Sequence, residues 1–220
     1  PCTGLFHPLG TLVRNSNMAE AYAWLLTEER LVTRYLEACT EQTVASLLAV
    51  GGSALDDPFV FMTYALEMLI PPWLGTAHFD RLVLPYDRRI NEAVHAVGGR
   101  HRAHCHGNSG AYLERFADMG IDGVEQLEPP PYGDNDLADA KRRVGRRMLL
   151  SGNIPSQAFH LSDFKIDSIR DLVWRALAPA FPESLGAGHL LSVCSVLMAG
   201  KHQDFGNDYL IIEPTVGGWG

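Results

Sequence analysis

The chain has 220 residues, of which 46% are hydrophobic and 20% charged, and its formal net charge is −8. This composition is typical of a globular protein with a substantial core, and the acidic balance argues against a nucleic-acid or anionic-membrane surface. No apolar run approaches the roughly 20 residues of a transmembrane helix, and the first residues do not resemble a signal peptide. Four thinly spread cysteines favour a reducing, cytoplasmic setting.

The first half of the chain predicts two long helical segments. Apolar residues at helical spacing predict a helix over about 17–50, and a short strand follows at 53–55. After an irregular stretch, a second helical pattern runs from about 77 to 97. Residues 1–6 could contain a further strand.

The second half alternates regularly between strands and helices. We expect strands at about 100–105, 121–128, 146–152 and 188–193, and helices at about 109–119, 137–144, 166–177 and 206–213. This alternation is typical of parallel βαβ units and so of an α/β fold. Two architectures fit it, a doubly wound sheet and a (β/α)₈ TIM-type barrel.

The barrel is favoured because the sequence has no glycine-rich phosphate loop, and because its polar, Gly- and Pro-rich stretches all follow strands. About six strands do not close a barrel. We therefore expect one domain over 1–220, a partial barrel whose N-terminal strands are missing or whose sheet is completed by a partner.

Potential metal ligands follow two strand ends. Because side chains alternate along a strand, His104 and His106 should point to one side, whereas Cys105 points away and His101 lies too far back. A catalytic Zn²⁺ site needs three protein ligands and an open position. Cys194, after the last predicted strand, is the best third candidate. A buried apolar role for this cysteine and a core role for His104 are the alternatives.

Other polar side chains belong to the same rim. Glu125 and Glu128 are three residues apart, so in a strand they would face opposite sides and only one could line the pocket. Glu125 is the predicted inward, catalytic carboxylate. Asn153 ends the next strand, where it could bind substrate or structure a loop. Trp73, in the irregular segment, could form part of a lid or simply pack.

Three segments resemble the uroporphyrinogen decarboxylase superfamily. They are "PCTGLFHPLGTLV", "FDRLVLPYDRRINEAVHAVGGRHRAHCHGN" and "FADMGIDGVEQLEPPPYGDNDLADAKRRVGRRMLLSGNI". The similarity covers nearly all of this chain but about the C-terminal two-thirds of a family member. It implies a (β/α)₈ barrel, in agreement with the alternation of elements.

The resemblance is nearer to one of two branches. Decarboxylases of the superfamily are cofactor-free and hold a porphyrinogen with N-terminal arginine and aspartate motifs, which this sequence lacks. The other branch contains zinc-dependent methyltransferases that act with methyl-corrinoid proteins and a thiol, and that carry an H-x-C pair and a cysteine on the last rim. This sequence matches at His104 and Cys194 but has His106 in place of a cysteine, which leaves a harder metal site.

The resemblance therefore implies a metal-dependent methyltransferase with Zn²⁺ as cofactor, a corrinoid as methyl donor, a small-molecule substrate and a corrinoid protein as a candidate partner. A decarboxylase active without metal, a non-catalytic corrinoid- or tetrapyrrole-binding barrel, and a purely structural metal site are the alternatives. The sequence leaves open whether the chain forms a homo-oligomer.

Overall fold

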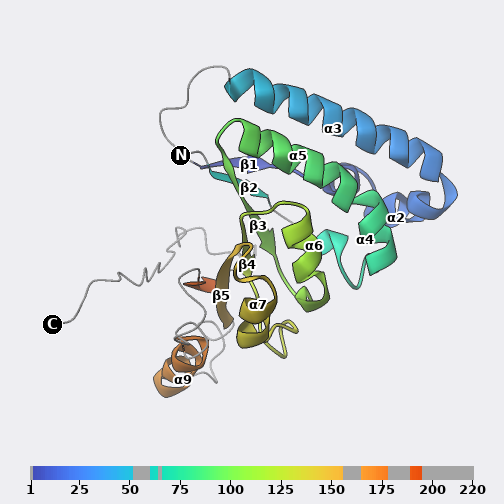
Figure 1. Ribbon diagram of the computed structural model, residues 1–220. Coiled ribbons are helices and arrows are strands. Elements are labelled where there is room, and N and C mark those ends of the chain that lie inside the picture. The colour runs from blue at the N-terminus through green and yellow to red at the C-terminus, as the bar shows by residue number, and fades with distance from the viewer. Residues whose placement is uncertain (1, 52–59, 64–65, 156–164, 178–188, 195–220) are drawn as a thin grey trace, which may run out of the picture.

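The computed structural model describes residues 2–51, 60–63, 66–155, 165–177 and 189–194 (Figure 1). One sheet contains six strands, β1 (Cys2–Leu5), β2 (Val60–Thr63), β3 (Arg100–Cys105), β4 (Gly123–Gln126), β5 (Leu149–Pro155) and β6 (His189–Cys194). The strands follow one another in sequence order and every neighbouring pair is parallel. A doubly wound sheet would reverse its order at a switch point. The predicted α/β fold of barrel type is confirmed.

The helices lie between successive strands. They are α1 (Pro8–Arg14), α2 (Met18–Thr27), α3 (Glu29–Gly51), α4 (Thr76–Leu82), α5 (Leu84–Ala96), α6 (Leu113–Asp118), α7 (Leu137–Val144) and α9 (Ile166–Leu177), with 3₁₀ turns η1 (Leu66–Leu69) and η2 (Gly110–Tyr112). Figure 1 shows α3 and α5 side by side along one flank. The predicted ranges 137–144 and 166–177 are confirmed. The single helix predicted over 17–50 is wrong, because the chain breaks at Glu28 between α2 and α3.

The outer face of the sheet forms the core. Ala103 and Cys105 on β3 are buried in an apolar cluster that includes Phe79, Tyr112 and Phe116. The rings of Phe79 and Tyr112 meet edge to face with centroids 5.1 Å apart. Each apolar side chain buried in this way contributes about 1.5–3 kcal/mol. Since alternate β3 residues are committed to this core, the intervening ones face the other side of the sheet.

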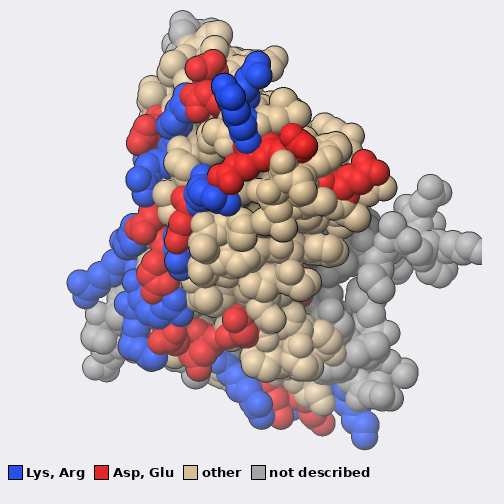
Figure 2. Space-filling model, turned by 90° about the vertical axis from the view of Figure 1, so that its right-hand side faces the viewer, with Lys and Arg blue, Asp and Glu red and all other residues tan. Residues whose placement is uncertain are grey.

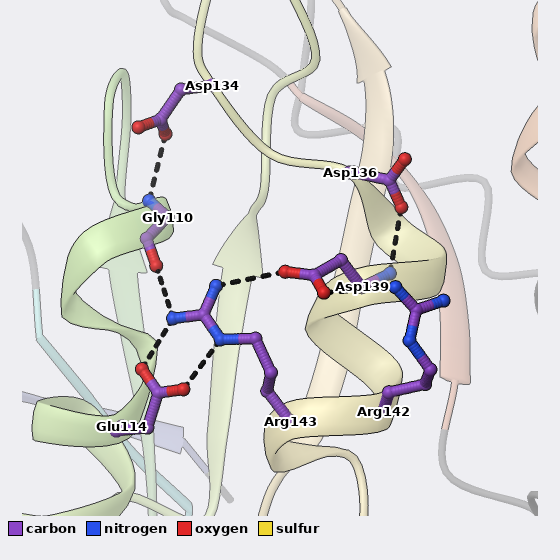
Figure 3. A network of polar contacts seen from close by, with 7 residues as sticks. All are labelled: Gly110, Glu114, Asp134, Asp136, Asp139, Arg142 and Arg143. Atoms are coloured by element: carbon purple, nitrogen blue, oxygen red, sulfur yellow. Dashed lines mark hydrogen bonds and ion pairs between the residues drawn. The ribbon is translucent and has the colours of Figure 1, made fainter.

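A polar network joins α6 to α7 (Figure 3). The Arg143 guanidinium donates to Glu114 Oε1 at 2.6 Å, to the Gly110 carbonyl at 2.8 Å and to Asp139 Oδ2 at 3.1 Å. Asp134 Oδ1 accepts from the Gly110 amide at 2.8 Å. These contacts attach the loop before α7, and α7 itself, to the turn that follows β3.

Charged side chains on the surface are interspersed. On the face in Figure 2, positive and negative side chains alternate along one side, next to a broad area with neither. Ion pairs such as Arg81–Glu29, at 2.9 Å, connect neighbouring helices. Such exposed pairs contribute about 0–1 kcal/mol each. Of the helices that the structure describes, none has the length and apolarity needed to cross a bilayer.

Candidate functional site

Two histidines at the carboxyl end of β3 share one face. His104 lies opposite Glu125 of β4 in the parallel ladder, and Glu125 lies opposite Ser151 of β5. The rings of His104 and His106 approach each other edge to face, with centroids 4.6 Å apart and an interplanar angle of 80°. Both side chains are partly exposed, at 16% and 19%. The prediction that these two imidazoles converge on one side of the strand is confirmed.

His104 is oriented by a buried carboxylate. Its Nδ1 lies 2.6 Å from Glu125 Oε1, and the other oxygen of Glu125 pairs with the Arg102 guanidinium. Arg102 also donates to Ser151 Oγ at 3.3 Å. Glu125 is almost fully buried, so its negative charge needs such partners to be tolerated in the interior. Arg102, Glu125 and His104 thus form a chain of polar contacts on the inner face of the sheet.

His106 has a second carboxylate partner. Its Nδ1 lies 3.2 Å from Glu128 Oε1, an ion-pair contact, and Glu128 Oε2 accepts from the Gly107 amide at 2.9 Å. Burial alone would lower the pKa of His106, but attraction to Glu128, with contributions from Glu67 and Glu125, outweighs it and raises that pKa. Burial alone would raise the pKa of Glu128, yet the His106 ring and the Gly107 amide lower it. Each histidine is therefore matched to its own glutamate.

Both glutamates contact the histidine pair, so the prediction that they face opposite sides is wrong, but only Glu128 lines the cavity beside His106. Strand β4 ends at Gln126, and Gln126 and Leu127 have φ values of 95° and 42°. These conformations end the strand alternation, so Glu128 is turned to the same side as Glu125. Residues other than glycine rarely adopt positive φ, and such residues cluster at functional sites. The irregular end of β4 builds the second half of the site.

The loop after β4 packs against this turn. Gly107 has a φ of 79°, in the left-handed region that favours glycine. A Cβ added to Gly133 would lie 2.3 Å from the Glu128 carbonyl oxygen and 2.7 Å from that of Gly107. Only glycine fits at position 133, because any side chain would separate the two turns that present the His106–Glu128 pair.

The structure describes the other two predicted site residues, Asn153 and Cys194, in less detail. Asn153 is half-buried near the carboxyl end of β5, two residues beyond Ser151, and lies opposite Ser192 of β6. The backbone of Cys194 pairs with Pro155 at the end of β6, but its side chain lies outside the described residues. Among the side chains that are described, no group of three or more His, Cys, Asp or Glu is arranged to hold a metal ion. The proposed ligand set, which includes Cys194, therefore stays a prediction.

A cavity of about 350 Å³ opens beside His106. It is lined by Glu67, Pro71, Pro72, Trp73, His106, Gly107, Glu128 and Tyr132. Trp73 stacks on Tyr22 with ring centroids 5.3 Å apart, and the Tyr22 hydroxyl donates to the Met68 carbonyl at 2.5 Å. Sequence reasoning had marked Trp73 but gave no reason to single out Glu67. Its volume lies within the range of small-molecule sites.

The opposite face of β3 carries a second polar group that the sequence did not reveal. His101 is buried there and bonds through Nδ1 to Asn91 of α5, while His7 pairs with Asp87 of the same helix. The two rings lie 6.4 Å apart. Burial, with smaller effects of His7 and His95, lowers the pKa of His101 to about 3, so its ring stays neutral. Residues four apart in a helical pattern, as Asp87 and Asn91 are, were the available signal.

Cys105 points into the core, as predicted. It is 1% exposed and belongs to the same apolar cluster as Ala103. Burial, together with the acidic groups Glu67, Glu128 and Asp134, raises the pKa of its thiol well above the usual value. The Cys105 thiol is therefore neither a nucleophile nor a metal ligand in this arrangement.

The chain was compared with known proteins. The family model for uroporphyrinogen decarboxylase (URO-D) matches residues 3–192. A solved structure, described as a methyltransferase from Methanosarcina mazei, is similar with a TM-score of 0.65 and 19% sequence identity, over 89% of this chain and 52% of that chain. The chain thus spans about half the length of that protein, and the likeness is one of fold. No curated protein matches the chain.

Proposed function

The chain belongs to the uroporphyrinogen decarboxylase family, and from this premise we propose that it takes part in metal-dependent transfer of a methyl group from a corrinoid to a thiol. The proposed metal ligands are His104, His106 and Cys194, with Zn²⁺ as the metal. The observation that carries the proposal is the pairing of two adjacent imidazoles with two glutamates at one strand end. The methyltransferase named above adds support at the level of fold.

The residue types of the proposed ligands suit a zinc ion. Histidines that bind metals almost always direct their other ring nitrogen to a carboxylate, carbonyl or water, which fixes the tautomer and the ring orientation. Here Nδ1 of each ring is directed to a glutamate, so each ring would bind through Nε2. Two nitrogens and one thiolate sulfur form a ligand set that zinc accepts in catalytic sites, with the fourth position open.

The protein residues would prepare the thiol and exclude water. When bound, a zinc ion supplies positive charge that deprotonates a thiol near neutral pH. Glu125 and Glu128 hold the histidines, and Arg102 in turn stabilises the charge of Glu125. Asn153, half-buried on β5, is the proposed hydrogen-bond partner of a substrate at the same edge of the sheet. In the overall reaction the thiol loses its proton, sulfur bonds to the methyl carbon, and the cobalt–carbon bond breaks with its electron pair left on cobalt.

The proposal also includes the partner protein, the route of the thiol and the cellular compartment. A corrinoid protein would present the methyl group at the open edge of the sheet, and a small thiol would enter through the cavity beside His106. The four spread cysteines favour a reducing compartment, so the cytoplasm is the proposed location.

Metal content of the purified chain tests the proposal. We expect about one zinc per chain, lost in His106→Ala and in Cys194→Ala. Matched controls are His95→Ala, an exposed histidine paired with Asp122, and Cys39→Ala, which should keep the metal. A methylcobalamin-dependent thiol alkylation assay then examines the chemistry. Wild-type protein that takes up no zinc after exposure to it would refute the methyltransferase proposal.

Decarboxylation is the second candidate, because the matching family model is described by that activity. It requires no metal, so a chelated protein that still releases carbon dioxide from a carboxylated substrate would favour it. The same zinc analysis therefore separates the two candidates.

A further inference from the structure

The cavity beside His106 has more acidic than basic groups, because the one basic side chain that lines it, His106, is already paired with Glu128. Its lining residues include two carboxylates, Glu67 and Glu128, and neither a lysine nor an arginine. The remaining walls are the aromatic rings of Trp73 and Tyr132 and a pair of prolines. Negative groups in a partly enclosed, low-dielectric site favour a positively charged ligand and disfavour an anion.

Glu67 supplies an independent observation. Its Oε2 atom is buried and makes no hydrogen bond to any residue that the structure describes. A buried carboxylate oxygen without a donor costs free energy, and a water, an ion or a ligand can supply the missing donor. Glu128, by contrast, already contacts His106 and the Gly107 amide. Glu67 is therefore the carboxylate that has capacity for a ligand.

The aromatic wall suits an organic cation. Trp73 is 47% exposed, and its indole is held by stacking on Tyr22, whose hydroxyl is itself fixed by the Met68 carbonyl. An indole is the best of the aromatic side chains for binding ammonium groups through cation–π attraction. A rigid aromatic ring beside a carboxylate recognises an alkylammonium group better than a bare metal ion, which would need several oxygen or nitrogen ligands.

We propose that this cavity binds the ammonium group of a small organic substrate, with Glu67 as its counter-ion and Trp73 as its aromatic wall. The substrate class that follows is a thiol carrying a protonated amine. Its participation in methyl transfer rests on the proposed function, whereas ammonium binding in the cavity does not. A thiol that ends in a sulfonate or carboxylate would place its negative charge against Glu67.

Three two-carbon thiols test the inference, because 2-aminoethanethiol, 2-mercaptoethanol and 2-mercaptoethanesulfonate share the thiol and differ in the charge of the end group. Their binding is measured by calorimetry or ligand-observed NMR, on the full chain with and without zinc. We expect the ammonium compound to bind at least about tenfold more tightly than the sulfonate in both forms. Equal binding of the three by the wild type would overturn the inference.

Variants assign the preference to the cavity. Glu67→Gln should remove it, Glu67→Asp should retain most of it, and Glu92→Gln, at an exposed glutamate of α5, should leave it unchanged. Trp73→Leu should weaken binding of the ammonium compound several-fold without affecting the sulfonate. A preference that persists in folded Glu67→Gln and Trp73→Leu would overturn the inference. A preference for ammonium in a chain that binds no zinc would support it while refuting the proposed function.

Discussion

The two faces of β3 use the same residue type in opposite ways. On the inner face, His104 and His106 are partly exposed and paired with carboxylates, and His106 lines a cavity. On the outer face, His101 is fully buried, bonded to the neutral amide of Asn91, and has a pKa lowered to about 3. The pKa of His106 is raised. Histidine content alone does not define a site, because the partner and the access of water decide whether the ring can exchange protons or ligands.

This comparison predicts a division of effects. Changes on the outer face should alter the free energy of unfolding and leave ligand binding unaffected. Changes on the inner face should alter ligand binding and leave the free energy of unfolding unaffected.

Removing His7 should give the largest change. In His7→Ala the buried carboxylate of Asp87 loses its hydrogen-bond partner, and leaving a buried acidic group without its partner costs about 3–5 kcal/mol of stability. Urea unfolding measures this loss. The double variant His7→Leu/Asp87→Leu, which removes both polar groups, should recover most of it. A single variant as stable as the wild type would show that the outer pair is not structural.

Glu125→Gln should act on the metal site. Loss of the carboxylate that orients His104 should weaken zinc binding about 10- to 100-fold, the usual cost of removing such a partner. Competition with a chromophoric chelator gives the affinity. Glu114→Gln, a glutamate paired with Arg143 on the outside, is the matched control and should bind zinc like the wild type. Unchanged affinity in Glu125→Gln would separate this glutamate from the site.

The pH dependence of stability should report on His101. Its pKa in the folded chain is about 3 and in the unfolded chain about 6.5, so the unfolded chain binds a proton first as the pH falls. The contribution of His101 to stability is complete above pH 6.5 and declines below it by up to about 1.4 kcal/mol per pH unit. Unfolding of the wild type and His101→Asn at about pH 7, 6 and 5 should show a shallower slope for the variant. Parallel slopes would contradict the neutral, buried state.

The smallest effect is expected at the exposed network in Figure 3. Arg143→Ala removes contacts to Glu114, Asp139 and the Gly110 carbonyl, yet these groups are well hydrated. We expect a loss of about 1 kcal/mol or less in the free energy of unfolding and no change in zinc content. A clear loss of zinc would instead show that the attachment of α7 to the turn after β3 positions the site.

The sequence predicted those helices and strands whose ends carry recognisable capping or turn residues. The helices over 137–144 and 166–177 were predicted within their observed bounds, and the strand at 100–105 coincides with β3. The helix α1 was missed, although Pro8 at its first turn is a start signal. The strand predicted at 53–55 and the helix at 206–213 lie outside the described residues. The break at Glu28 has neither glycine nor proline to mark it.

The site was predicted only as far as strand alternation reaches. Alternation correctly separated His104 and His106 from Cys105, since these residues lie in or next to a regular strand. The pairing of His104 with Glu125 depends on the register between β3 and β4, which one sequence does not fix. The contribution of Glu128 depends on positive φ values at Gln126 and Leu127, and neither glutamine nor leucine predicts a positive φ. Tertiary packing, not local propensity, determines them.

The irregular end of β4 has a consequence for how related sequences can diverge. Because the chain changes direction between Glu125 and Glu128, inserting or deleting one residue there would separate a glutamate from its histidine while leaving the strands intact. The identity of the residues at 126 and 127 is less constrained than the number of residues between the two glutamates. Relatives that retain this arrangement should therefore preserve the spacing of the two glutamates more strictly than the residues between them. In an alignment, a segment of constant length and variable composition would be its signature.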